Sequence, residues 1–147
     1  MSLWSTDIFE NGIAQTCAEL HIPVVAYSPL GRGAFTGSIK SVDDIPEDDF
    51  RRHMSRFQKD AFQANLRLIN EVEKLAERKG VSPTQIALVW VKSMSGKPGM
   101  PIIIPIPGGT TSDKVVQNMQ DVGLLSDTEL AEIEAVLQEN KVVGARY

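Results

Sequence analysis

The sequence predicts an α/β protein. Two short runs of β-branched and other apolar residues, 24–27 and 102–106, stop at prolines, and glycines follow. Between and after these runs, apolar residues recur every three to four positions, which is the spacing of amphipathic helices. Strands that alternate with helices in this way predict a parallel sheet packed against helices.

The first strand is expected at Val24–Tyr27, directly before Pro29 and the pair Gly31 and Gly33. An uninterrupted apolar run is typical of a parallel strand with both faces covered. Proline and glycine end the strand, and they allow the next loop to lie close to a ligand. The loop after this strand is therefore a candidate binding segment.

A helix is expected ahead of this strand, over Ile8–Leu20, with Thr6 or Asp7 as its N-cap. Its apolar residues have roughly helical spacing: Ile8, Ile13, Cys17 and Leu20. Such a helix would cover the strand, and Cys17 on its apolar face is expected to be a buried thiol.

The segment Gly31–Asp49 has no apolar periodicity and is rich in Gly, Ser and Asp. Loops of this length in a compact domain are usually functional or disordered. Its carboxylates could be taken for a general acid pair, but their polar surroundings favour a solvated loop. The carboxylates concerned are Asp43, Asp44, Glu47, Asp48 and Asp49.

Helical patterns dominate the rest of the chain. One runs over Lys59–Arg78, with Gly80 as its terminator. Two capping boxes, each a serine followed three positions later by Gln or Glu, start helices that end near Ser95 and Asn140: Ser82 with Gln85, and Ser126 with Glu129.

The second strand is expected at Ile102–Ile106, and a short helix from Thr111 or Ser112 to about Gln120 should follow its loop. Helix starts carry unpaired N–H groups with partial positive charge, which attract anions. Gly108 and Gly109 would let a phosphate approach, hydroxyls of Thr110, Thr111 and Ser112 could donate to it, and Lys114 adds a cation. The alternative is a plain turn capped by hydroxyls.

Composition excludes several classes of partner. The net charge is −4 and the isoelectric point is near 5.2, which argues against nucleic acid and anionic membranes as ligands. No apolar run approaches the roughly 20 residues of a membrane span. Cys17 is the single cysteine, so a reducing, cytoplasmic location is expected. His21 and His53 lack partners at ligand spacing, and no metal site is expected.

The two loops carry a resemblance to a known family. Residues 27–33 (YSPLGRG), 104–111 (IPIPGGTT) and the pair Gln117-Asn118 resemble the motifs of aldo-keto reductases. The segment 56–58 (RFQ) is most similar to the fungal pyridoxal-reductase-type branch. The resemblance extends from about Ser2 to about Tyr147 and implies a (β/α)8 (TIM) barrel that uses NADPH, NADP⁺ being its oxidised form.

The resemblance also implies roles for individual residues. Tyr27 would stack on the nicotinamide, and Ser28, Leu30, Gly31 and Arg32 would line the pyrophosphate and ribose. The second loop would bind the 2′-phosphate and adenine through Gly109, Thr110, Thr111, Lys114, Gln117 and Asn118. Tyr27 as plain core and Arg32 as a solvated side chain remain alternatives. So does NADH in place of NADPH, because many relatives carry Lys or Arg where Gly108 stands and Arg where Lys114 stands.

By this resemblance the chain, residues 1–147, is a partial barrel: the last two strands and their helices, with the amino-terminal half absent. The family's catalytic Asp, Tyr, Lys and His belong to that half and match nothing here. We therefore expect cofactor binding, a small carbonyl substrate for the full-length protein, and no turnover by this chain alone. Self-association or pairing with the missing half is also expected. The alternative is a non-catalytic nucleotide-binding or scaffold module.

Overall fold

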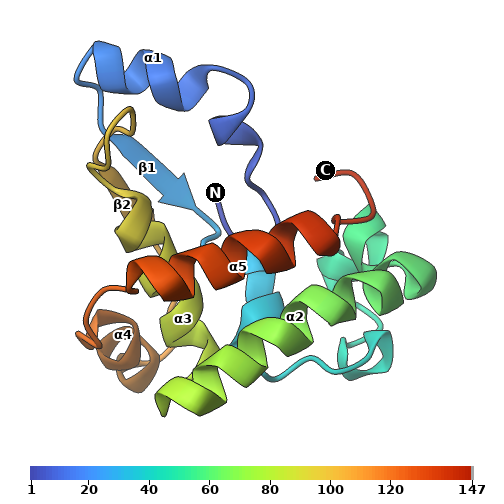
Figure 1. Cartoon of the computed structure of the whole chain (residues 1–147). Helices are drawn as coiled ribbons and strands as arrows, with labels where there is room; N and C mark the ends of the chain where they lie inside the picture. Colours follow the sequence, from blue (N-terminus) through green and yellow to red (C-terminus); the bar gives the residue numbers. More distant parts are fainter. Residues whose placement is uncertain (147) are drawn as a thin grey trace.

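A parallel sheet joins β1 (Val24–Tyr27) to β2 (Ile103–Ile106) in the computed structural model, which describes residues 1–146 (Figure 1). Val24 is aligned with Ile103 and Tyr27 with Ile106, so the two strands end at the same edge. Both predicted strands and their parallel pairing are confirmed. The chain is α/β, with helices around a two-stranded sheet.

The helices after the first strand also match the sequence patterns: α2 (Lys59–Lys79), α3 (Pro83–Met94), α4 (Ser112–Met119) and α5 (Asp127–Glu139). Gly80 ends α2. Both capping boxes form, at Ser82 with Gln85 and at Ser126 with Glu129. These starts and stops depend on neighbouring residues alone, so the local sequence is enough to predict them.

The core lies where α2, α3 and one face of the sheet meet. α3 packs against both α2 and β2, and α5 packs against α2 and crosses in front of α3 in Figure 1. Ala26 and Ile103 face this core and are 1% and 4% exposed. Trp4 and Phe57 join it through an edge-to-face ring contact with centroids 5.3 Å apart.

The other face of the sheet is open, which corrects the expectation that both faces are covered. Its exposed apolar side chains alternate with the buried ones along each strand: Val25, Tyr27, Ile104 and Ile106. The apolar run predicted the strands correctly, but these four side chains remain 39–57% exposed, and the Arg146 guanidinium lies over the Tyr27 ring. We call these four residues the open sheet face.

The first helix is shorter than predicted and covers little of the sheet. A 3₁₀ turn (Asp7–Phe9) is followed by α1 (Ile13–Glu19), whose N-cap is Gly12 rather than Thr6 or Asp7. Only Ala14 of α1 is buried, and Cys17 is half-buried rather than buried. In Figure 1 α1 stands at one end of the molecule, near the start of β1.

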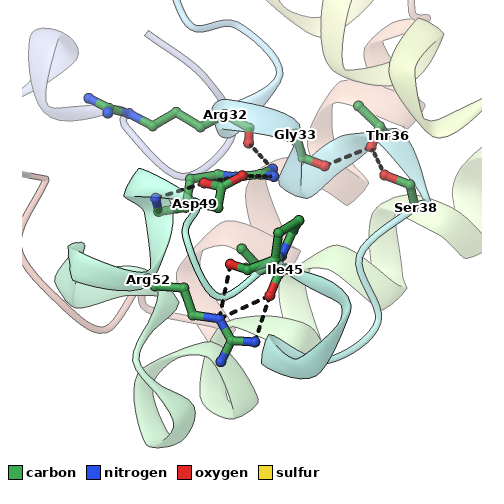
Figure 2. Close-up of polar contacts among 9 residues, drawn as sticks. Arg32, Gly33, Thr36, Ser38, Ile45, Asp49 and Arg52 are labelled. Atoms are coloured by element: carbon green, nitrogen blue, oxygen red, sulfur yellow. Dashed lines mark hydrogen bonds and ion pairs between the residues drawn. The ribbon is translucent and has the colours of Figure 1, made fainter.

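The segment after β1 is ordered and belongs to the core. It folds as four short 3₁₀ turns: Gly31–Thr36, Val42–Asp44, Phe50–His53 and Ser55–Phe57. Ile39 and Ile45 are 4% and 0% exposed. Arg52 holds the segment together, donating from Nε and Nη2 to the carbonyl of Ile45 (Figure 2). Of the two readings of this segment, disorder is therefore wrong.

Candidate functional site

The loops that follow β1 and β2 meet in one cleft of about 710 Å³. Both strands end at the same edge, so their loops project side by side, which is the usual position of ligand sites in parallel sheets. The cleft is lined by residues of both loops and of α4, together with Thr36, Ser38 and Thr84.

Seven predicted site residues line this cleft. From the first loop they are Ser28, Leu30 and Arg32, and from the second loop and α4 they are Thr110, Lys114, Gln117 and Asn118. The first and last of these lie 90 positions apart in the chain, and the parallel pairing of β1 with β2 brings them together.

Two further predicted residues shape the cleft without lining it. Thr111 is the N-cap of α4, and its Oγ1 accepts a hydrogen bond from the Lys114 backbone N at 3.3 Å. A Cβ on Gly109 would meet the Val115 side chain at 2.7 Å, so glycine allows the loop to pack against α4.

Lys114 and Asn118 also hold the second loop. Lys114 Nζ lies 3.4 Å from Thr110 Oγ1, and Asn118 Nδ2 donates to the Gly108 carbonyl at 3.2 Å. One face of α4 therefore carries a cation and an amide toward the Gly-Gly-Thr loop. The contact with Thr110 places the Lys114 charge at the cleft.

Tyr27 and Gly31 lie on a second, smaller cavity. A Cβ on Gly31 would approach Trp4 Nε1 to 2.8 Å, so Gly31 is needed for packing against the indole rather than for contact with the cleft. Ser28 and Arg32 line both cavities. The two cavities are thus neighbours along the first loop, and Ser28 and Arg32 stand between them.

The first loop has an unusual backbone. Ser28 and Arg32 have φ of 50° and 58°, in the left-handed region that non-glycine residues seldom occupy. Such conformations persist where surrounding contacts fix them, and they are common at ligand sites.

An ion pair between Asp49 and Arg51 fixes the backbone of this loop at Arg32. The Asp49 carboxylate accepts from Arg51 Nε at 2.9 Å and from Nη2 at 2.7 Å, while Arg51 Nη1 donates to the Arg32 carbonyl at 3.0 Å. The hydrogen bonds from Arg51 lower the pKa of Asp49 to about 2, so the pair stays charged at neutral pH. In Figure 2 the Arg32 carbonyl faces this ion pair, and the Arg32 side chain extends away from the pair.

Three hydroxyls in the cleft belong to no motif in the sequence: Thr36, Ser38 and Thr84. Thr36 Oγ1 donates to the Gly33 carbonyl and lies 2.7 Å from Ser38 Oγ. Thr84 is in the first turn of α3, far from both loops in the chain. In the sequence these three residues stand out only as polar, and polar residues are as common on any exposed surface as in a cleft.

The cleft suits an anionic ligand. Among the described residues that line it, Arg32 and Lys114 carry positive charge and no carboxylate is present. Hydroxyls and amides supply neutral donors around the two cations, as phosphate groups require. Fold and cleft together define an α/β protein with a candidate site, at the carboxyl ends of parallel strands, whose charge and donors suit an anion.

Comparison with known proteins identifies the family of the chain. The model of the family described as "Aldo/keto reductase family" matches residues 1–138. The chain belongs to the aldo-keto reductase family.

Three relatives show how far the likeness extends. A Saccharomyces cerevisiae protein named "Putative pyridoxal reductase" is 41% identical over 155 residues, covering 100% of this chain and 45% of the relative. A Schizosaccharomyces pombe protein named "Aldo-keto reductase yakc [NADP(+)]" is 39% identical over 94% of this chain and 39% of its own. A solved glycerol dehydrogenase from Gluconobacter oxydans superposes with a TM-score of 0.80 at 29% identity, covering 95% of this chain and 41% of its own.

The resemblance to pyridoxal-reductase-type members is therefore confirmed. The chain spans less than half the length of these relatives. Within residues 1–146, no helix combines the length and the apolar composition needed to cross a bilayer.

Proposed function

We propose that this chain is the cofactor-binding part of an NADPH-dependent aldo-keto reductase. The observation that carries the proposal is the single cleft into which both predicted loops project, with Arg32 and Lys114 as its two cations. One relative is named for NADP⁺, and a cleft lined by these cations and by hydroxyls fits the phosphates of that cofactor.

In this proposal each end of the cofactor has its own residues. Lys114, Thr110 and the start of α4 bind the 2′-phosphate, and Gln117 and Asn118 bind the adenine. Ser28, Leu30 and Arg32 follow the pyrophosphate toward Tyr27, whose exposed side chain meets the nicotinamide. The bound cofactor would supply hydride to a carbonyl carbon, and the relatives' names favour pyridoxal-type aldehydes as substrates.

The proton that must reach the carbonyl oxygen comes, in this proposal, from residues outside the chain. The described residues that line the cleft include no carboxyl, imidazole, thiol or phenol group, and the Tyr27 phenol on the neighbouring cavity is assigned to the nicotinamide rather than to proton transfer. This absence also favours the second candidate function, a nucleotide-binding module without catalysis. The two candidates share the same site and differ only in whether a partner segment brings the proton donor.

The open sheet face is the proposed contact for that partner. Val25 and Ile104 are 57% and 47% exposed there, and each strand has one unpaired edge. Unpaired parallel edges beside an apolar face are templates for further strands. We infer that the chain pairs with a strand-bearing segment of the kind that its longer relatives contain, or with a second copy of itself.

Calorimetric titration with 2′,5′-ADP and 5′-AMP tests the proposed function directly. We expect 2′,5′-ADP to bind more tightly, because the extra phosphate meets Lys114 and the N-terminus of α4. Equal affinity for the two ligands, or no binding of either, would contradict the proposal.

A further inference from the structure

The C-terminal segment brings a positive charge to the face of Tyr27. The Arg146 guanidinium carbon lies 5.0 Å from the centre of the Tyr27 ring, within the range of a cation–π contact. The same guanidinium donates from Nη1 to both Asp7 carboxylate oxygens, at 3.1 and 3.3 Å. Arg146 thus contacts both the Tyr27 ring and the Asp7 carboxylate, and Arg32 and Arg56 line the same small cavity.

The chain fixes this segment by long-range contacts. Asn65, 2% exposed on α2, exchanges hydrogen bonds with the backbone N and carbonyl of Val143. Arg56 Nε donates to the Gly144 carbonyl at 3.2 Å. Gly144 has φ of 97°, and a Cβ there would come within 2.9 Å of the Arg56 backbone. These contacts fix the backbone at Val143 and Gly144, two residues before Arg146.

A cation that contacts an aromatic ring changes the preference of that ring for charged or neutral ligands. The guanidinium already interacts with the negative face of the ring. A second cation therefore binds the ring less favourably than a neutral group does. Like charges close together also repel, most strongly where little water lies between them. Tyr27 keeps 39% of its surface exposed, which leaves part of its side chain accessible to a ligand.

We propose that Arg146 is a positioning residue that makes Tyr27 discriminate between the two redox states of the nicotinamide. The oxidised ring carries a positive charge and the reduced ring is neutral, so Arg146 favours NADPH over NADP⁺. Asp7 moderates the effect because its carboxylate offsets part of the Arg146 charge. This inference rests on the proposed function, in which Tyr27 meets the nicotinamide.

The test measures three dissociation constants on the 147-residue chain by calorimetry, for NADPH, NADP⁺ and 2′,5′-ADP. The variants are Arg146→Gln, which removes the cation, and Asp7→Asn, which removes the moderating anion. Arg67→Gln is the matched control, because Arg67 is an exposed arginine of α2 that lies outside both cavities. 2′,5′-ADP has no nicotinamide and so reports on the cleft alone.

We expect the ratio of the NADP⁺ to the NADPH dissociation constant to fall in Arg146→Gln and to rise in Asp7→Asn, each by about two- to fivefold. Arg67→Gln should leave the ratio unchanged, and no variant should change 2′,5′-ADP binding. A purely structural role would shift both cofactors equally and leave the ratio constant, which would overturn the inference. Ratios that move in the same direction in both variants would also overturn it. If the unaltered chain fails to bind 2′,5′-ADP, the proposed function is wrong, and the inference falls with it.

Discussion

Asn65 and Val143, 78 residues apart, are joined by two hydrogen bonds between a buried side chain and an irregular stretch of backbone. Asn65 Nδ2 donates to the Val143 carbonyl at 3.0 Å, and the Val143 N–H donates to Asn65 Oδ1 at 2.8 Å. Nδ2 also donates to the Arg56 carbonyl at 3.3 Å. One amide thus ties α2, the end of the 3₁₀ segment and the C-terminal segment together.

The first prediction concerns this amide. Asn65→Ala should lower the free energy of unfolding by about 1–3 kcal/mol, because it removes a buried amide and its three hydrogen bonds to part-buried backbone groups. Asn70→Ala, at an exposed position of the same helix, controls for helix propensity and should have little effect. Urea denaturation followed by circular dichroism measures both, and equal midpoints for the two variants would rule out the proposed role of Asn65.

The second prediction concerns pH. Hydrogen bonds from Lys79 and from the Ser126 backbone lower the pKa of Glu129 from 4.5 to about 2. The unfolded chain therefore binds a proton at higher pH than the folded chain does, so the stabilisation is complete above about pH 4.5 and is lost as the pH falls toward 2. Asp49, whose pKa Arg51 lowers to about 2, acts in the same window.

Urea midpoints measured from about pH 6 down to about pH 3 check this expectation. Glu129→Gln is the matched variant, because the capping box tolerates either residue at this position. Its midpoint should fall less steeply with acid than that of the unaltered chain. Parallel pH profiles would show that Glu129 contributes nothing to acid sensitivity.

The parts of the fold that sequence could predict are those fixed by near neighbours. Ser82 with Gln85, Ser126 with Glu129, and Gly80 after α2 each define a helix end within four residues. The covering of β1 could not be predicted in this way, because an apolar run does not say whether the opposite face has a partner. The 3₁₀ turns between Gly31 and Phe57 could not be predicted to belong to the core, because their apolar residues have no regular spacing. Hydrogen bonds from side chains such as Arg52 to backbone carbonyls hold them in place.

The candidate site also contains residues that local motifs predict and residues that only the fold brings together. The seven cleft residues of the two loops and α4 can be predicted because each loop has its own motif and follows a strand. Tyr27 faces a neighbouring cavity instead, a distinction that depends on the alternation of side chains at the end of β1. Thr84 was missed because α3 brings it to the cleft from a distant part of the chain.

The third prediction concerns assembly. At micromolar concentration the chain should scatter light as a species larger than its 16.1 kDa monomer, because the open sheet face and both sheet edges invite pairing. Ile104→Lys places a charge in the middle of that face and should reduce the apparent mass. Met119→Lys, at a 75% exposed position of α4, is the control and should leave the mass unchanged. A monomeric unaltered chain with a cooperative thermal transition would contradict the expectation.

The fourth prediction concerns turnover. The chain alone should not oxidise NADPH in the presence of pyridoxal or simple aldehydes, because the proposal assigns Lys114 to the 2′-phosphate and Tyr27 to the nicotinamide, which leaves neither to protonate the carbonyl. Absorbance of NADPH is followed against a boiled sample. Oxidation above that background, abolished by Tyr27→Ala, would show that the described residues suffice for catalysis.

The fifth prediction concerns Lys114, the cation that the Thr110 contact places at the cleft. In the calorimetric titration, Lys114→Ala should weaken 2′,5′-ADP binding by about 1.5–3 kcal/mol, the cost of one charge-assisted contact, and should scarcely change 5′-AMP binding. That difference between the two ligands tests the central claim, a site that recognises the 2′-phosphate of NADPH. The account predicts a selective loss for 2′,5′-ADP; an equal loss for both ligands would contradict it.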